Sequence, residues 1–357
     1  MQRAIKQQRH QEVLLKTPMA DNKPNTWSTR RNQVTVLFVS ITITFILIEL
    51  LLRSVNIFEP EPIAYVGEYT NRPSQHFVVD PETGWRMRPQ HQFSWTFDGV
   101  ESAYRSNSQG FRSNSEFDPA DRRKKIVLVG DSFTFGAGVE YKETYGARLE
   151  SQLTNSVVYN LAMPGFGIDQ IWLSVRHQAL ALRPSLIIVG FIDDDFDRSM
   201  TAYRPVEGFN KPTFILRNGR VVAKEASDRP NGLLRLLNNH SRVWFIGRLA
   251  YRRLAYHIAI GEWLSLNQAI LQAIQADCAE KKVTVLFVRM QRKGRPKEFY
   301  TLRSFMDRIG ANYLDQLDHG PILRDIWFAT DDHMNAKGYR QIAEIILEWC
   351  RENMPEL

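Results

Sequence analysis

The sequence contains few cysteines and little net charge beyond its first 33 residues. Its two cysteines, Cys278 and Cys350, allow at most one disulfide and lack the paired spacing of a zinc site. We expect both to be buried thiols in helices. Residues 1–33 hold seven basic and two acidic side chains, so five of the seven net positive charges lie there. The remaining chain is nearly balanced, which argues against a nucleic-acid-binding domain.

The chain has one long hydrophobic run. Residues 34–52 read VTVLFVSITITFILIELLL, with Glu49 as the single charge. About 20 apolar residues cross the hydrocarbon core of a bilayer as a helix. A cleaved signal peptide has a shorter apolar core followed by small residues, whereas this run continues into Leu51-Leu52-Arg53. We therefore predict an uncleaved, single-pass signal anchor over residues 34–55.

The flanks of this anchor predict its orientation. The basic residues precede it, so the N-terminus is expected to stay in the cytoplasm. A polar tail over 1–33 is expected to be disordered. The rest of the chain would then lie outside the cytoplasmic face of the inner membrane.

Residues 56–122 are predicted to form a linker and a small β-rich cap. Glu59-Pro60-Glu61-Pro62 is typical of a stiff linker, and residues 92–97 alternate as a strand does. Two triplets repeat a glycine, an aromatic residue and an arginine: Gly84-Trp85-Arg86 and Gly110-Phe111-Arg112. An arginine of either triplet could bind an anionic substrate group, but we favour a buried structural ion pair.

From residue 123 to 357, apolar strands alternate with helices, which predicts a parallel sheet covered on both faces. Strands are expected at 125–129, 157–162, 185–192, 283–288 and 312–314, and helices at 141–153, 168–182, 262–280, 296–308 and the C-terminus. Residues 193–260 interrupt this rhythm as an insertion. It contains a predicted hairpin around Asn218-Gly219 and a basic, aromatic helix from Arg242 to Tyr256. We favour packing of that helix on the domain over a lid or membrane contact.

Two distant blocks carry the chemistry. Lys125–Val129 leads into Gly130-Asp131-Ser132, which places a serine at the carboxyl end of a strand, where open α/β sheets bind ligands. Such a serine is a candidate nucleophile if a base can reach it. Near the C-terminus, Asp331-Asp332-His333 precedes a helix start. A histidine with an aspartate two residues before it could supply that base and its orienting carboxylate.

Together, Gly130-Asp131-Ser132 and Asp331-Asp332-His333, followed by Asn335 and Gly338, resemble the SGNH (GDSL-type) hydrolases, in particular their membrane-anchored bacterial type. The resemblance covers roughly residues 125–350 and implies a three-layer α/β fold with a flavodoxin-like parallel sheet. It also implies roles for individual residues: Ser132 as nucleophile, His333 as base, Asp331 as orienter with Asp332 as runner-up, and backbone N–H groups of Ser132 and Gly165 as oxyanion donors, with Gly167 competing with Gly165.

The sequence departs from this family after the third strand. There the family has an asparagine whose amide donates to the oxyanion, and here the sequence is Asp193-Asp194-Asp195. Asp194 takes the asparagine position, with Asp193 as the alternative. An ionised aspartate donates no hydrogen bond. Three outcomes stay open: crowding keeps a proton on Asp194, the enzyme works slowly with two donors, or it hydrolyses nothing.

A metal site formed by Asp193, Asp194, Asp195 and Asp197 is the less favoured interpretation of this acidic run. A solvated acidic loop is favoured, and no metal or cofactor is expected.

We therefore predict serine-dependent hydrolysis of O-acyl esters through an acyl-enzyme. The expected partners are the membrane and an acylated glycan or lipid of the cell envelope. Two alternatives are kept: an O-acyltransferase acting on an extracytoplasmic polysaccharide, and a non-catalytic binding module of the same fold.

Overall fold

The computed structural model divides the chain into two compact units, which are described separately: residues 1–62 with 232–251, and residues 63–231 with 252–357. The structure describes residues 26–55, 75–204, 209–224, 236–237, 240–293, 300–319 and 324–357. The linker Glu59-Pro60-Glu61-Pro62 lies outside the described residues.

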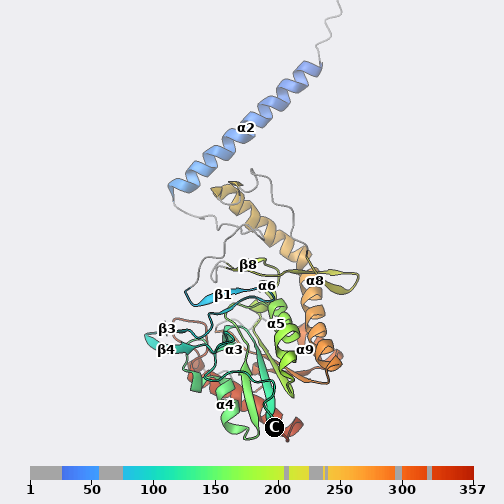
Figure 1. Cartoon of the computed structure of the whole chain (residues 1–357). Coiled ribbons are helices and arrows are strands. Elements are labelled where there is room, and N and C mark those ends of the chain that lie inside the picture. The colour runs from blue at the N-terminus through green and yellow to red at the C-terminus, as the bar shows by residue number, and fades with distance from the viewer. Residues whose placement is uncertain are drawn as a thin grey trace, which may run out of the picture. The chain divides into compact units, whose positions relative to one another are not determined.

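The larger unit is built on a five-stranded parallel sheet (Figure 1). Its strands lie in the order β13-β12-β7-β5-β6. Their bounds are β5 Lys124–Gly130, β6 Ser156–Asn160, β7 Leu186–Phe191, β12 Thr284–Arg289 and β13 Asn312–Asp315. Numbered along the chain, these strands run 2-1-3-4-5, which is the flavodoxin-like order. The strand order reverses between β5 and β7, and ligands bind at that switch point in open sheets. The predicted fold class is confirmed.

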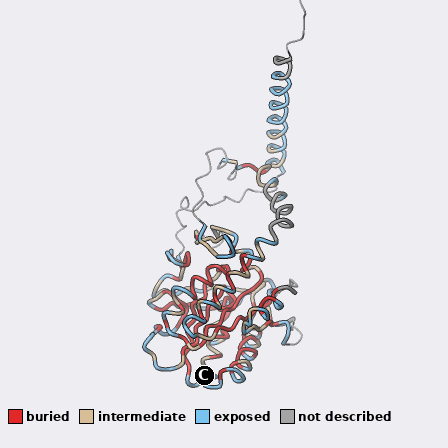
Figure 2. The backbone as a smooth tube through the Cα atoms, turned by 90° about the vertical axis from the view of Figure 1, so that its right-hand side faces the viewer, coloured by how far each residue is buried: buried red, intermediate tan, exposed pale blue. Residues whose placement is uncertain are grey.

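Alternating side chains of each strand enter one of two cores, as a pleated strand requires. Ile126 and Leu128 of β5 pack in one core, and Val127 and Val129 pack in the other. Helices α4 (Tyr145–Gln152) and α10 (Ala336–Asn353) cover the first face. The second face is covered by α5 (Ile168–Ser174), the C-terminal part of α8 (Arg242–Glu280) and α9 (Tyr300–Arg308). Figure 2 shows the buried backbone concentrated in this layered body.

The predicted β-rich cap consists of two antiparallel hairpins. Strand β1 (Phe77–Asp80) pairs with β2 (Gly84–Met87), and β3 (Gln92–Phe97) pairs with β4 (Val100–Arg105). Trp85, Met87 and Tyr104 enter the same core as α5 and α8, so the hairpins pack on the main domain.

The insertion contains the predicted hairpin. Strands β10 (Phe214–Arg217) and β11 (Arg220–Ala223) are joined by Asn218-Gly219, both at positive φ, as a type I′ turn requires. A two-residue pair, β8 (Tyr203–Arg204) with β9 (Phe209–Asn210), precedes it.

Several element boundaries differ from the sequence expectation. The basic, aromatic helix and the helix expected at 262–280 form one continuous helix, α8, because no proline separates them and Gly261, which lies between them, continues the helix. The helix expected at 168–182 changes to a π-helix at Val175–Ala179 and to a 3₁₀ turn at Leu180–Leu182. The acidic run was expected to be a solvated loop, but Asp194–Arg198 form a short helix, α6.

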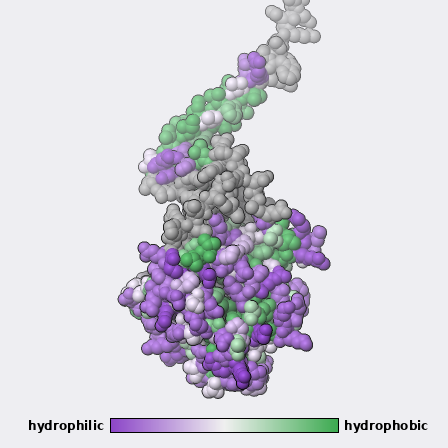
Figure 3. Space-filling model, in the orientation of Figure 1, coloured by the Kyte–Doolittle hydropathy of each residue, from purple (hydrophilic) through white to green (hydrophobic). Residues whose placement is uncertain are grey.

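In the smaller unit, helix α2 (Thr26–Ser54) contains the hydrophobic run and begins eight residues earlier than predicted. Within its stretch Arg31–Ser54, an 18-residue window has a mean hydropathy of 2.5 and no buried residue. Figure 3 shows the mostly hydrophobic surface of this helix. By length and composition it suits a membrane anchor or a signal sequence.

The charge in this run, Glu49, caps another helix. Its carboxylate accepts hydrogen bonds from the backbone N–H groups of Arg242 (3.1 Å) and Val243 (3.0 Å) and from the Ser241 hydroxyl (2.9 Å). These groups begin α8, and a carboxylate there satisfies N–H groups that have no acceptor within the helix. Glu49 therefore joins two elements that lie far apart in the sequence.

Candidate active site

Ser132 lies at the first position of a one-turn helix, α3 (Ser132–Phe135), directly after β5. The carboxylate of Asp131 caps this helix by accepting from Phe133 N at 2.9 Å. Gly130 makes the tight turn feasible, since a Cβ there would lie 2.2 Å from Thr134 Oγ1 and 2.5 Å from Gly190 O. Any larger residue at 130 would push β5 and β7 apart at the sheet edge.

His333 lies in the loop before α10. Asn335 caps that helix, its side-chain oxygen accepting from Lys337 N at 2.9 Å, while its amide nitrogen donates to Trp327 O at 3.0 Å. A Cβ on Gly338 would lie 2.6 Å from Ile326 O. The Asn-x-x-Gly pattern therefore caps the helix and allows the preceding loop to pack closely against its first turn.

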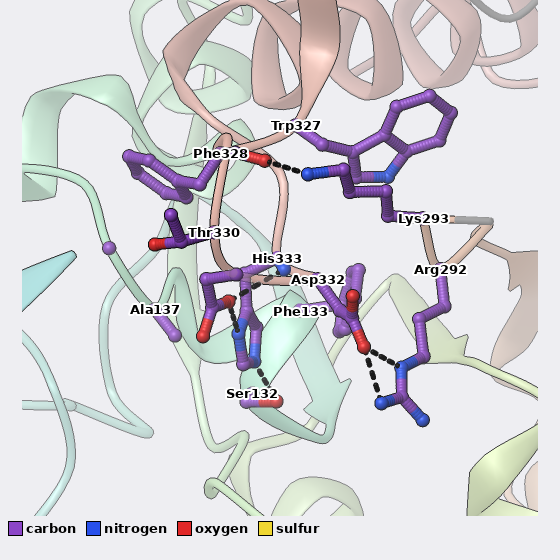
Figure 4. A network of polar contacts seen from close by, with 12 residues as sticks. Ser132, Phe133, Ala137, Arg292, Lys293, Trp327, Phe328, Thr330, Asp332 and His333 are labelled. Carbon is purple, nitrogen blue, oxygen red and sulfur yellow. Dashed lines mark hydrogen bonds and ion pairs between the residues drawn. The ribbon is translucent and has the colours of Figure 1, made fainter. Parts of the chain in front are cut away.

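The structure brings the three predicted triad residues into one chain of contacts. His333 Nε2 lies 2.8 Å from Ser132 Oγ, and His333 Nδ1 lies 2.6 Å from Asp331 Oδ1. Figure 4 shows the imidazole pointing at the serine hydroxyl. Ser132 and His333 are 201 residues apart in the sequence; Ser132 directly follows β5, and His333 shortly precedes α10.

The electrostatics of Asp331 suit an orienting carboxylate. The hydrogen bond from His333 holds the pKa of Asp331 below its usual range. An ionised Asp331 accepts a hydrogen bond from Nδ1–H, so the lone pair of the imidazole is left on Nε2, facing Ser132. Phe133 and Phe97 hold the ring, with ring centroids 4.9 and 5.6 Å from it.

Asp332, the runner-up orienter, points elsewhere. Its carboxylate accepts from Arg292 Nε at 2.7 Å and pairs with a second nitrogen of the same guanidinium. Figure 4 shows this pair beside the imidazole, with Asp332 turned toward Arg292. The structure therefore brings Asp331, and not Asp332, to the imidazole.

Gly165 lines the same pocket as Ser132 and His333. It has φ +79°, a conformation that suits glycine. In the part of the chain that the structure describes, neither Ser132 N–H nor Gly165 N–H donates to another protein group. Both N–H groups therefore stay available to a ligand in the pocket, whereas Gly167 begins α5 as its cap residue.

The acidic run after β7 is paired with arginines and is not solvated as expected. Asp193 is bound by Arg289 at 2.9 and 3.0 Å, and the same guanidinium reaches Asp315 at 2.8 Å. These groups are buried, and a buried charge needs such a partner. Among the described residues, no cluster of three or more histidine, cysteine or acidic side chains could hold a metal ion.

Asp194 pairs with Arg292 and does not line the pocket of Ser132. Asp195 is fully buried, binding Ile192 N at 3.0 Å and Arg198 at 2.5 Å. Burial and the nearby charge of Asp131 raise the pKa of Asp195 well above its usual range. The carboxylate of Asp194 is directed to Arg292. The oxyanion role of Asp194 stays a prediction.

The pocket has a volume of about 610 Å³ and contains residues that the sequence did not single out. Trp95 and Phe97 line it beside Ser132, and so do Arg198 and Arg292. Arg198 donates to Asp131 at 3.0 Å and to Phe166 O at 3.1 Å, so it supports the nucleophile turn from below. No local motif marks these residues, because each is recognised only by its distant partners.

A serine, an imidazole and a carboxylate at the switch point of a parallel α/β sheet define a class of hydrolase. A family model described as GDSL-like lipase/acylhydrolase matches residues 126–346. This match covers more than half of the chain, so the protein belongs to that family and is an ester-hydrolysing enzyme.

Solved structures resemble part of the chain. A lipolytic protein of the G-D-S-L family from Desulfitobacterium hafniense is 14% identical, with a TM-score of 0.41 over 63% of this chain and 98% of that one. TesA is 11% identical, with a TM-score of 0.42 over 66% and 100%. The acetyl xylan esterase AlAXEase is 12% identical, with a TM-score of 0.37 over 63% and 98%. No curated protein sequence matches the chain.

Proposed function

We propose that this protein is a serine esterase that cleaves O-acyl esters through an acyl-enzyme. Ser132 is the nucleophile, His333 the general base and Asp331 its orienter. One observation carries this proposal: the contacts Ser132 Oγ–His333 Nε2 of 2.8 Å and His333 Nδ1–Asp331 Oδ1 of 2.6 Å form an unbroken line.

In the first half-reaction, Ser132 Oγ attacks the ester carbonyl carbon while His333 Nε2 takes the hydroxyl proton. The tetrahedral intermediate then collapses, breaking the bond to the alcohol oxygen, which receives the proton from Nε2. In the second half-reaction, His333 takes a proton from water, and the hydroxide attacks the acyl carbon. Collapse returns the proton to Ser132 and releases the carboxylic acid.

The backbone N–H groups of Ser132 and Gly165 stabilise the oxyanion in both steps. The family's third donor, an asparagine amide, is replaced by a carboxylate that is bound to Arg292. Removing one oxyanion donor costs about 10²–10³ in rate in a well-studied hydrolase. We therefore expect a working but slow esterase that relies on two backbone donors.

The substrate is an ester of the cell envelope, either an acylated glycan or an acylated lipid. Two features support this: the apolar helix α2 suits a membrane anchor, and a basic flank before it favours an extracytoplasmic body. Trp95 and Phe97 at the pocket supply an apolar wall for a short acyl group.

The proposal is tested with the full-length protein in detergent. Wild type, Ser132→Ala and His333→Ala are compared for hydrolysis of p-nitrophenyl acetate and for labelling by a fluorophosphonate. Removing a triad member costs about 10³–10⁶ in rate in characterised hydrolases. We expect both variants to lose activity and labelling to this degree while remaining folded.

A folded wild-type protein that neither hydrolyses the ester nor reacts with the fluorophosphonate would refute the proposal and favour a binding module. Product formation that requires an added polysaccharide acceptor would instead favour the acyltransferase, with the same three residues.

A further inference from the structure

Residues 77–112 lie before the region matched by the family, 126–346, yet they contact three loops of the active site. We propose that this segment, here called the brace, sets the relative positions of the nucleophile, the oxyanion donor and the catalytic histidine. The brace contains the hairpins β1–β2 and β3–β4 and the turn that ends at Arg112. This inference rests on the proposed function.

The first contact orients the oxyanion donor. The indole Nε1 of Trp85 donates to Pro164 O at 3.1 Å. The Pro164–Gly165 peptide bond is trans, so its C=O and N–H point in opposite directions. A hydrogen bond that fixes the carbonyl of Pro164 therefore also fixes the direction of Gly165 N–H. Trp85 is fully buried, stacks on Phe209 and meets Phe166 edge to face, which leaves its indole little freedom.

The second contact holds the chain that leaves the nucleophile helix. Arg112 is 1% exposed and donates to three backbone carbonyls between residues 135 and 139, Phe135 O (3.1 Å), Gly136 O (2.5 Å) and Val139 O (2.7 Å), and to Ala103 O of β4 (3.4 Å). Its guanidinium also lies 4.2 Å from the centre of the Tyr104 ring. The expected ion pair at Arg112 is therefore replaced by a cluster of carbonyls, which a planar guanidinium can bind together.

Strand β4 also binds the loop that follows α3, next to Arg112. The Tyr104 hydroxyl accepts from Gly138 N at 2.7 Å, and the Ser102 hydroxyl donates to Gly138 O at 3.0 Å. Both backbone groups of one residue are thus held by the brace. The loop after Ser132 has little freedom to move away from the sheet.

The third contact reaches the histidine loop. Asp98, at the tip of the β3–β4 hairpin, accepts from Thr330 N at 2.9 Å and also from Ala329 N and the Thr330 hydroxyl. These residues immediately precede Asp331. Lys293 holds the carbonyl of Phe328 at 2.7 Å, so the brace supplies one of at least two supports for this loop.

The brace therefore bridges three loops that follow different strands of the sheet. The sheet alone fixes where each strand ends, but not how far each loop extends beyond it. A displacement of about 1 Å in a catalytic group can cost about 10²-fold in rate. Trp85, Asp98 and Arg112 are accordingly positioning residues: they touch the loops and not the reacting atoms.

Trp85→Phe tests the first contact, because it removes the N–H and keeps a ring for packing. Trp172→Phe is its matched control: Trp172 is also buried and donates Nε1–H to Asp277 at 2.9 Å, but this hydrogen bond joins helices α5 and α8 and reaches no loop of the active site. In the full-length protein we expect Trp85→Phe to lower kcat on p-nitrophenyl acetate by about 10–100-fold with little change in KM. Trp172→Phe should lower Tm similarly and leave kcat unchanged.

Asp98→Gly tests the third contact at an exposed site where folding is safe. Asp98 and Gly99 have φ of +49° and +76°, so glycine fits this type I′ turn without strain. Asn218→Gly introduces glycine at the corresponding position of the same turn type in the β10–β11 hairpin. We expect a fall in kcat of about tenfold for Asp98→Gly only, because Lys293 still supports the loop. Asp98→Asn keeps one acceptor oxygen and should restore part of the rate.

The outcomes separate the inference from the function on which it rests. If the wild type shows no Ser132-dependent hydrolysis, both fall. If it does, and kcat of Trp85→Phe and Asp98→Gly equals that of their controls, the brace is refuted while the esterase stands. If Trp85→Phe fails to fold, the comparison of kcat between Asp98→Gly and Asn218→Gly decides whether the brace positions the catalytic loops.

Discussion

Two acidic clusters lie at the same edge of the sheet, and they differ in their partners. Asp193, Asp194 and Asp195 follow β7, and each carboxylate contacts an arginine. In the second cluster, Asp331 contacts the imidazole of His333, while the adjacent Asp332 contacts Arg292. Arg292 therefore joins the two clusters through Asp194 and Asp332.

The comparison teaches that the partner, and not the position along the chain, gives a carboxylate its role. An arginine is always charged and has no proton to exchange at physiological pH, so a carboxylate bound to it contributes structure. An imidazole changes protonation state during acyl transfer, and a carboxylate bound to it can stabilise the charged form. Asp331 alone, among these five, has such a partner in the structure.

The sharpest test of this comparison replaces each of the two carboxylates near His333, Asp331 and Asp332, by an amide, one at a time. Asp331→Asn should lower kcat by about 10³–10⁴, because an amide can stabilise the wrong imidazole tautomer. Asp332→Asn removes the same charge one residue away and should stay within a few-fold of wild type. Rates on p-nitrophenyl acetate decide; a larger loss for Asp332→Asn would reassign the orienter.

Substitutions in the arginine-bound cluster should lower the free energy of unfolding more than they lower the rate of hydrolysis. Asp193→Asn leaves the buried guanidinium of Arg289 with Asp315 as its main charged partner. Breaking a buried ion pair costs about 3–5 kcal/mol, so we expect a loss near 3 kcal/mol in the free energy of unfolding. Urea denaturation measures it, with the exposed Asp197→Asn as control, expected within about 0.5 kcal/mol. Equal stability of the two variants would contradict a structural role for Asp193.

The smallest expected effect is at Asp194, which we predicted to take the position of the family's oxyanion asparagine. Asp194→Asn replaces the carboxylate that pairs with Arg292 by an amide that can donate a hydrogen bond. We expect kcat to be preserved or raised, measured on the same ester with Ser132→Ala as the blank. A fall of about tenfold or more would mean that the pairing of Asp194 with Arg292 itself serves the reaction.

The fold was readable from local patterns. Buried strands such as 125–129 and 185–192 are short apolar runs between helical segments, and their alternation specifies a parallel sheet. The two blocks around Ser132 and His333 were also readable, because a strand, a glycine and a serine, or an Asp-x-His before a helix cap, are contiguous in the sequence. The Asn218-Gly219 turn was predictable for the same reason.

Features that depend on distant partners were not readable. The acidic run after β7 looks solvated until Arg289, Arg292 and Arg198 are brought to it from three other places in the chain. The two glycine–aromatic–arginine triplets look alike, but they contact loops of the active site through different residues. In the first triplet Trp85 makes the contact, and in the second Arg112 makes it. The identity of a side chain does not predict its role in the acidic run or in the triplets, because its burial and its partners depend on the tertiary structure.

The sequence by itself therefore determined the class of fold, the apolar helix and the residue types available for acyl transfer, since these follow from periodicity and from contiguous motifs. The tertiary structure alone decided which aspartate meets His333, which carboxylates are neutralised by arginine, and that the segment before the matched domain grips three catalytic loops. The physical reason is range: hydrogen bonds and ion pairs act over a few ångströms, and only the fold brings together residues that are up to about 200 positions apart.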